Sequence, residues 1–133
     1  MSEVIEIGTT FDEFIFKLEL GKVKELMAAI GDDNPAYISG EILPPTIPTI
    51  IDLWGGKTPY GQLLELNLEK VLYGGQKYEY LKNIKVGDEI TVTTEVADIQ
   101  TKKGMDFYTV KREYKNQQKE TAIIGYTTII ERH

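Results

Sequence analysis

The spacing of apolar residues changes partway along the chain. In the first part, four apolar residues recur at i, i+3, i+4 and i+7: Val23, Leu26, Met27 and Ile30. This spacing predicts a helix with one apolar face, and the glycine at position 31 is typical of the residue that ends a helix. Just upstream, apolar and polar residues alternate from residue 14 to residue 20, which predicts a short strand that the next glycine breaks.

A second helix is predicted between residues 46 and 54. It follows a proline-rich segment that includes Pro44 and Pro45, and Thr46 is a candidate N-cap. Its isoleucines, leucine and tryptophan leave it apolar nearly all round, so it should be buried. Gly55-Gly56 ends it, and residues 57–70 are predicted to form a loop with a helical turn near Leu63-Leu64.

The second half of the chain is strand-like. Alternating or aromatic-rich segments cover residues 71–82, 90–96, 107–116 and 122–130. Turn residues separate them at 86–88, 103–104 and 116–119. Antiparallel strands joined by short turns, together with one fully buried helix, predict a curved sheet wrapped around that helix. We therefore expect an α+β fold, and the length of 133 residues predicts one domain spanning residues 1–133.

Composition removes several kinds of chemistry. The chain has no cysteine and one histidine, His133, which excludes disulfides, cysteine nucleophiles and metal sites built on His or Cys. A net charge of −6 argues against binding to the nucleic-acid backbone. The N-terminus lacks the pattern of a signal peptide and no segment is a transmembrane candidate, so we expect a cytoplasmic protein that contacts neither nucleic acid nor membrane.

The segment Gly31 to Tyr37 is the richest candidate site. It contains Asp32, Asp33 and Asn34, followed by a proline and, two positions later, Tyr37. Taken alone, aspartate, asparagine and proline are ordinary turn formers. Three more segments follow in the chain: Leu43-Pro44-Pro45-Thr46, the glycine-containing stretch 72–80, and Val86-Gly87-Asp88.

Taken in this order, these segments resemble those of the MaoC-like (R)-specific hydratases and dehydratases. Within that family the chain is most similar to the N-terminal MaoC-like dehydratase domains, which include accessory subunits of mycobacterial-type fatty-acid synthase II dehydratases. The resemblance implies a hot-dog fold and a homodimer or heterodimer with a second MaoC-like chain. It also implies addition or removal of water across the Cα–Cβ bond of an acyl thioester, carried by CoA or an acyl-carrier protein, without a cofactor or metal.

The resemblance also assigns roles to residues. In the family an aspartate and a histidine of the turn share the acid–base work, and here these positions hold Asp32 and Tyr37. A tyrosine with a pKa near 10 is a poor base at neutral pH. The catalytic set implied by the resemblance is Asp32, Asn34 and Tyr37. The substrate-binding set is Pro45, Thr46 and Ile47 at the start of the buried helix, with Gly74, Gly75 and Gln76.

Three functional readings stay open from the sequence. The first is an accessory subunit that shapes an acyl tunnel while a partner supplies the histidine. The second is a homodimeric thioesterase or hydratase that uses Asp32 or Asp33 as its base. The third is a non-enzymatic acyl-CoA-binding protein. A degraded site is a further alternative, and Gly74-Gly75 is equally typical of a β-bulge or a close-packing point.

Overall fold

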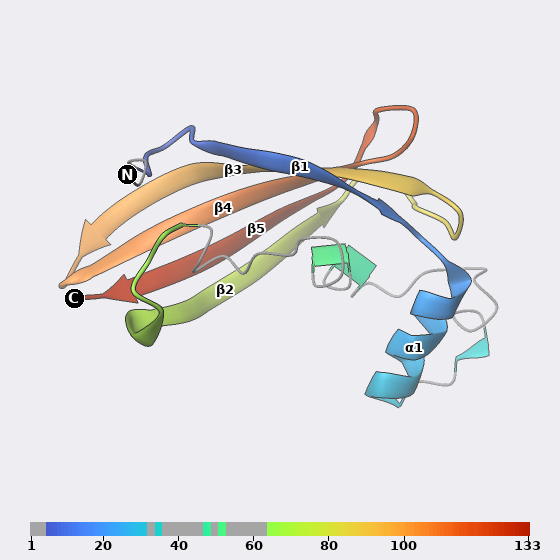
Figure 1. Cartoon of the computed structure of the whole chain (residues 1–133), viewed down its shortest axis with the longest axis horizontal. Helices are drawn as coiled ribbons and strands as arrows, with labels where there is room; N and C mark the ends of the chain where they lie inside the picture. Colours follow the sequence, from blue (N-terminus) through green and yellow to red (C-terminus); the bar gives the residue numbers. More distant parts are fainter. Residues whose placement is uncertain (1–4, 32–33, 36–46, 49–50, 53–63) are drawn as a thin grey trace.

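A curved antiparallel sheet dominates the computed structural model, which describes residues 5–31, 34–35, 47–48, 51–52 and 64–133 (Figure 1). Its five strands lie in the order β1-β3-β4-β5-β2. The elements are β1 (Thr10–Lys17), α1 (Leu20–Ile30), the 3-10 helix η1 (Leu68–Lys70), β2 (Val71–Tyr80), β3 (Glu89–Lys102), β4 (Met105–Lys115) and β5 (Thr121–Arg132). All neighbouring strands pair antiparallel.

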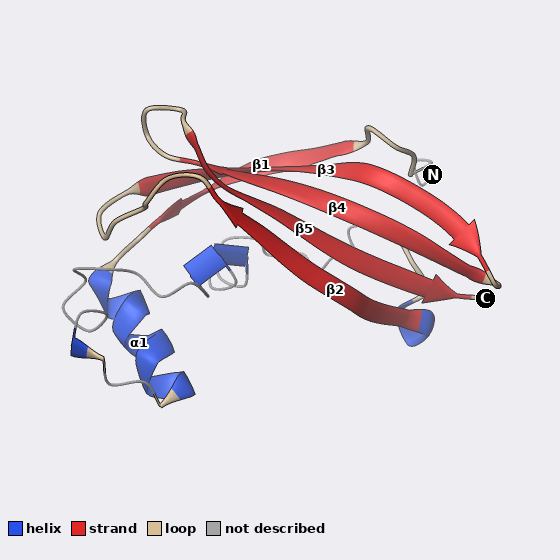
Figure 2. Cartoon of the chain, turned by 180° about the vertical axis from the view of Figure 1, so that it is seen from behind, coloured by secondary structure: helices blue, strands red, loops and turns tan. Residues whose placement is uncertain are grey.

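The curvature of the sheet has identifiable causes. The register shifts between Phe11 and Phe14 in β1 and between Val96 and Asp98 in β3, and such bulges bend a strand and increase its twist. The tight β3–β4 turn is possible because Lys103 and Gly104 both adopt positive φ angles, of 53° and 73°. The sheet therefore arches over the helical segments, as seen from both sides in Figures 1 and 2.

The α1 helix is close to its prediction. It ends at Gly31, whose φ of 70° is left-handed and whose backbone N–H caps carbonyls of the last turn. Its apolar face is buried, with Val23 and Met27 at most 1% exposed. This face packs at one end of the sheet and closes that end of the core.

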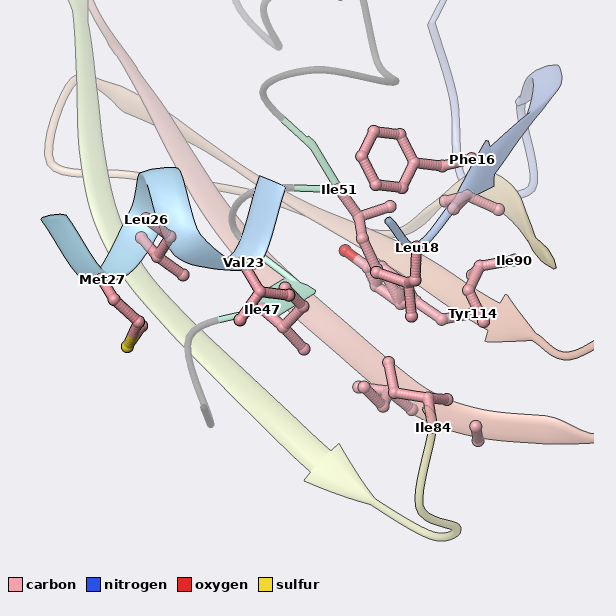
Figure 3. Close-up of a cluster of buried hydrophobic side chains, with 13 residues drawn as sticks. Phe16, Leu18, Val23, Leu26, Met27, Ile47, Ile51, Ile84, Ile90 and Tyr114 are labelled. Atoms are coloured by element: carbon pink, nitrogen blue, oxygen red, sulfur yellow. The ribbon is translucent and has the colours of Figure 1, made fainter. Parts of the chain in front are cut away.

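The second predicted helix is described at residues 47–48 and 51–52, which are helical. Ile47 and Ile51 are buried in the same cluster as Val23 of α1, and Figure 3 shows all three side chains pointing into it. Tyr114 of β4 also belongs to this cluster. The burial predicted for this segment is confirmed at these positions, and the remainder of the predicted helix lies outside the described residues.

Several strand boundaries differ from the sequence prediction. The strand predicted over 90–96 extends to Lys102, past a bulge between Val96 and Asp98 that interrupts the alternation. The first strand begins at Thr10 and ends at Lys17, instead of running from 14 to 20. In its first half apolar and polar residues do not alternate, because this edge strand has a bulge. At the other end, α1 begins at Leu20. The strand predicted over 71–82 ends at Tyr80, after which the backbone N–H groups of Leu81 and Lys82 both bond to the carbonyl of Ala122.

Neither a membrane-spanning helix nor a group of metal ligands is found in the described part of the chain. No helix there is long and apolar enough to cross a membrane. No group of three or more acidic or histidine side chains there could hold a metal ion.

Candidate functional site

The structure describes only part of the predicted catalytic turn. Gly31 ends α1, and Asn34, which follows close behind, is exposed to solvent. Asp32, Asp33 and Tyr37 lie outside the described residues. The catalytic roles of this segment stay predictions.

The predicted substrate-binding residues fall at two places. Of the first set, Pro45 and Thr46 lie outside the described residues, and Ile47 is a core residue at 2% exposure. Gly74, Gly75 and Gln76 lie in β2, at the outer edge of the sheet. The predicted binding residues thus belong to two separate parts of the chain, the helical segment that begins near Ile47 and the edge strand β2.

Packing accounts for one of the two glycines. The register of β2 against β5 shifts between Tyr73 and Gly75, which makes a bulge. A Cβ placed on Gly74 would lie 2.7 Å from Cδ1 of Ile130, whereas one placed on Gly75 would meet nothing within 4 Å. Close packing against β5 therefore favours glycine at position 74, and the predicted binding role of this segment stays a prediction.

Gln76 also has a role within the sheet. Its Oε1 accepts a hydrogen bond from Oγ1 of Thr127 at 2.6 Å, and its Nε2 donates to the carbonyl oxygen of Tyr126 at 3.2 Å. Both partners belong to β5, so this side chain ties the edge strand to its neighbour.

A buried charged cluster lies between the second helical segment and the sheet. The sequence patterns did not predict it. Oδ1 of Asp52 accepts a hydrogen bond from the Tyr114 hydroxyl at 2.6 Å and lies 3.0 Å from Nη1 of Arg112. The Arg112 Nε donates to Oγ1 of Thr94 on β3 at 3.0 Å. The side chain of Arg112 is 6% exposed and that of Asp52 is 15% exposed, so the pair is largely shielded from water.

Opposing effects act on the Asp52 carboxyl. Its burial raises the pKa above the usual value, while the Arg112 charge and the hydrogen bonds from Tyr114 and Arg112 lower it. Burial is the larger effect, so the pKa is raised overall. The arginine charge and the tyrosine hydroxyl both favour the ionised form, and together they make the burial of a carboxylate tolerable at this position.

The cluster belongs to a row of polar side chains that crosses the inner face of the sheet. The buried polar residues of the described chain are Thr94 on β3, Arg112 on β4 and Thr127 on β5. Thr94 and Arg112 are register partners, as are Val110 and Thr127. This row separates the apolar cluster around α1 from a second cluster built on Leu64, Val96, Val110 and Ile129.

A sequence signal for this cluster exists. Every second residue at the end of β4 points inward, namely Val110, Arg112 and Tyr114, so a charged residue occupies a core position. Asp52 stands beside Ile51 in a segment that otherwise reads as apolar. Opposite charges at two inward positions indicate a buried pair.

The only histidine of the chain lies elsewhere. His133 follows β5, and its Nε2 lies 3.1 Å from Oδ2 of Asp106, at the start of β4. Figure 1 places this C-terminal end at the far end of the sheet from α1. Hydrogen bonds from Thr101 and then from His133 lower the pKa of Asp106.

Comparison with known proteins identifies the family. Residues 6–124 match the family described as "FAS1-like, dehydratase domain region". The chain belongs to this family. Among curated relatives, a UPF0336 protein of Streptomyces coelicolor is 29% identical over 122 residues, which cover 84% of this chain and 81% of that protein. A UPF0336 protein of Thermobifida fusca is 28% identical, with coverage of 84% and 80%.

Solved structures show the fold of this chain. The (3R)-hydroxyacyl-ACP dehydratase complex HadBC of Mycobacterium tuberculosis superposes with a TM-score of 0.76 at 17% identity, covering 97% of this chain and 98% of that chain. The (R)-hydratase from A. caviae gives 0.71 at 19% identity, covering 99% and 100%. The chain thus has the hot-dog fold that the sequence predicted, and its match to a dehydratase family agrees with the predicted resemblance to the MaoC-like dehydratases.

Proposed function

We propose that this chain is an acyl-thioester-binding hot-dog subunit, related to the (R)-specific dehydratases that act on 3-hydroxyacyl-CoA or 3-hydroxyacyl-ACP. In this proposal it pairs with a second MaoC-like chain that carries the missing histidine. The observation that carries the proposal is the turn at residues 31–37, which keeps the family's aspartate and asparagine but has Tyr37 at the histidine position.

The chemistry explains why this substitution matters. Removing water from a 3-hydroxyacyl thioester requires a base for the α-proton, an acid for the leaving hydroxyl and a donor that polarises the carbonyl. Asp32 and Asn34 are the proposed polar groups of the turn, and backbone N–H groups near Thr46 and Ile47 are the proposed donors. The tyrosine hydroxyl at position 37 can donate a hydrogen bond but does not readily cycle a proton at neutral pH.

The position of His133 supports this division of labour. It pairs with Asp106 at the end of the sheet away from α1, and its side chain is 53% exposed. Within the described structure this histidine therefore lies far from the end of α1, after which the proposed catalytic turn begins. In this proposal the proton-cycling imidazole comes from the second MaoC-like chain.

The exposed edge of the sheet supports a partner. Five of the large exposed apolar side chains lie in η1, β2 and the residue after it: Leu68, Leu72, Tyr73, Tyr80 and Leu81. On its outer side β2 pairs with no strand of the described chain. An edge strand that exposes aromatic and aliphatic side chains is a template for pairing with another sheet.

Structural relatives support a two-chain arrangement. The HadBC dehydratase and the ChsH1-ChsH2 protein of Mycobacterium tuberculosis are both described as complexes. Homodimerisation through the same edge is compatible with the exposed side chains, so the identity of the partner is part of the test. A cytoplasmic location is part of the proposal, because acyl-CoA and acyl-carrier-protein substrates are made there.

The deciding experiment is hydration of a short trans-2-enoyl-CoA. We expect the purified chain alone to bind the substrate with little turnover. Addition of a MaoC-like chain with an intact Asp–His pair should give full turnover. Asp32→Ala serves as the control for the turn. Turnover by the chain alone that Asp32→Ala abolishes would overturn the accessory role, and absence of binding would overturn the thioester site.

A further inference from the structure

We infer that Asp52, Arg112 and Tyr114 form a clamp that fixes how the helical residues 47–48 and 51–52 dock on the sheet. In this role the three are positioning residues. They act on the proposed thioester site through Ile47, which is buried in the same cluster as Ile51. That functional consequence rests on the proposed function, whereas the docking role does not.

The contacts of the clamp come from separate parts of the fold. Asp52 is bound at Oδ1 by both Arg112 and Tyr114, at 3.0 and 2.6 Å. Arg112 is held in turn by Thr94 of β3 at 3.0 Å, and its guanidinium lies 5.3 Å from the ring centre of Phe14 on β1. The Asp52 carboxylate is thus bound by two donors of β4, and contacts with β1 and β3 fix the position of one of them, Arg112.

Apolar packing alone does not determine this docking. Ile47 and Ile51 present one apolar face to the core cluster, but the hydrophobic effect has no direction and permits sliding or rotation of that face. Hydrogen bonds are directional and short-ranged, so they select one position. Among the described residues of the sheet, Arg112 and Tyr114 are the donors to Asp52, and their fixed positions favour one orientation of the segment that carries it.

The burial of these charges argues for positioning over stability. A buried ion pair contributes little net stability, because loss of hydration offsets much of the attraction between the charges. Replacing a buried ion pair by apolar residues of similar size often leaves stability unchanged or raises it. A clamp predicts that such a replacement keeps the fold stable and loosens only the segment at residues 47–52.

The test compares wild type with the double variant Asp52→Leu/Arg112→Met. Hydrogen exchange, followed by mass spectrometry, reports separately on a peptide covering 47–52 and on peptides from β3, β4 and β5. We expect exchange in the 47–52 peptide to rise about tenfold, the effect of losing roughly one buried hydrogen-bonded contact, while the strands stay protected. Lys111→Met is the matched control, because Lys111 is the neighbouring residue of β4 and makes only surface ion pairs, with Glu95 and Glu113.

Asp52→Asn provides a second, milder variant that keeps an oxygen at the same place and removes the charge. It should raise exchange in the 47–52 peptide by a smaller factor. Equal changes in the segment and in the strands, or no change in either variant, would overturn the clamp. The exchange result stands even if wild type binds no acyl thioester, which keeps the two proposals separable.

A binding measurement completes the test. With a short enoyl-CoA as the probe, the double variant should bind more weakly than wild type, and Lys111→Met should match wild type. If Asp52→Asn abolished binding without changing exchange in the 47–52 peptide, Asp52 would contact the ligand directly. That result would contradict a positioning role.

Discussion

At the residue scale, the two glycines of β2 differ in what surrounds them. A methyl group on Gly74 would lie 2.7 Å from Cδ1 of Ile130 and 3.2 Å from Cγ2 of Thr128. Gly74→Ala is expected to destabilise the protein by about 1–3 kcal/mol, the typical effect of overpacking, softened where the isoleucine end can turn away. Urea unfolding followed by circular dichroism measures this.

Gly75→Ala is the matched control for that variant. Nothing lies within 4 Å of a Cβ at Gly75, so the substitution should be neutral or stabilising by up to about 1 kcal/mol, through reduced entropy of the unfolded chain. Equal losses in both variants would show that the bulge itself, not the contact with β5, requires glycine.

Tyr37 offers a direct test of the missing acid–base group. Tyr37→His restores the residue that the family places in this turn, and an imidazole with a pKa near 6.5 can both take and give a proton at neutral pH. We expect hydration of a short enoyl-CoA to rise by about 100-fold, the low end of what general acid–base catalysis contributes. Tyr37→Phe, which removes only the hydroxyl, should show no gain. If the two variants were folded and equally inactive, the turn would not be the acid–base site.

At the element scale, the β3–β4 hairpin carries a small acid-sensitive contact. The Thr101 hydroxyl, at 2.6 Å from Oδ1 of Asp106, and then His133 lower the pKa of that carboxyl. A carboxyl with a lowered pKa in the folded state stabilises the fold above its usual pKa, and this contribution is lost as the pH falls through the folded pKa.

Thr101→Val should therefore lessen the dependence of stability on pH in the acid range. The variant is expected to lose up to about 1 kcal/mol at pH 6 and less at pH 3, a small effect because the contact lies near the surface. Urea unfolding at the two pH values measures it. Thr93→Val is the control. Thr93 lies on the same strand, opposite Glu113 and away from Asp106, so this variant should change stability equally at the two pH values. A pH-independent loss in Thr101→Val would mean that the hydroxyl matters for packing only.

The elements themselves were largely predictable from the sequence. The α1 helix follows from its 3.6-residue period and ends at the predicted glycine, because both depend on local geometry. The predicted 103–104 turn is confirmed by the positive φ angles of Lys103 and Gly104. The position of β2 beside β5 could not be derived in the same way, since Leu72 pairs with Ile130 across a long stretch of chain.

The candidate site shows the same division between local and long-range information. The residues of the turn are adjacent in sequence, so their pattern reveals them. The Asp52–Tyr114 contact joins residues 62 positions apart, and no local period records such a pairing. The segment around Asp52 was predicted to be apolar nearly all round, and the buried carboxylate is the exception that the long-range fold creates.

At the scale of the whole molecule, the two edges of the sheet are built differently. Both edge strands have a bulge, but the bulge of β1, between Phe11 and Phe14, contains the acidic residues Asp12 and Glu13, whereas the bulge of β2, between Tyr73 and Gly75, contains a glycine. Charges of this kind protect an edge from pairing with another sheet. The β2 edge instead exposes Tyr73, at 65% exposure, in a strand with several other apolar side chains. The asymmetry predicts that association uses the β2 edge.

Two substitutions to lysine, one on each edge strand, test this directly. Tyr73 and Ile15 are apolar side chains of similar exposure, 65% and 60%, on opposite edge strands. Tyr73→Lys introduces a charge at the proposed interface, where it would lose hydration on association, and should shift a dimer to monomer in size-exclusion chromatography with light scattering. Ile15→Lys should leave the mass unchanged. Dissociation by Ile15→Lys alone would place the interface on β1, and a partner chain would then have to cover the bulged, acidic edge.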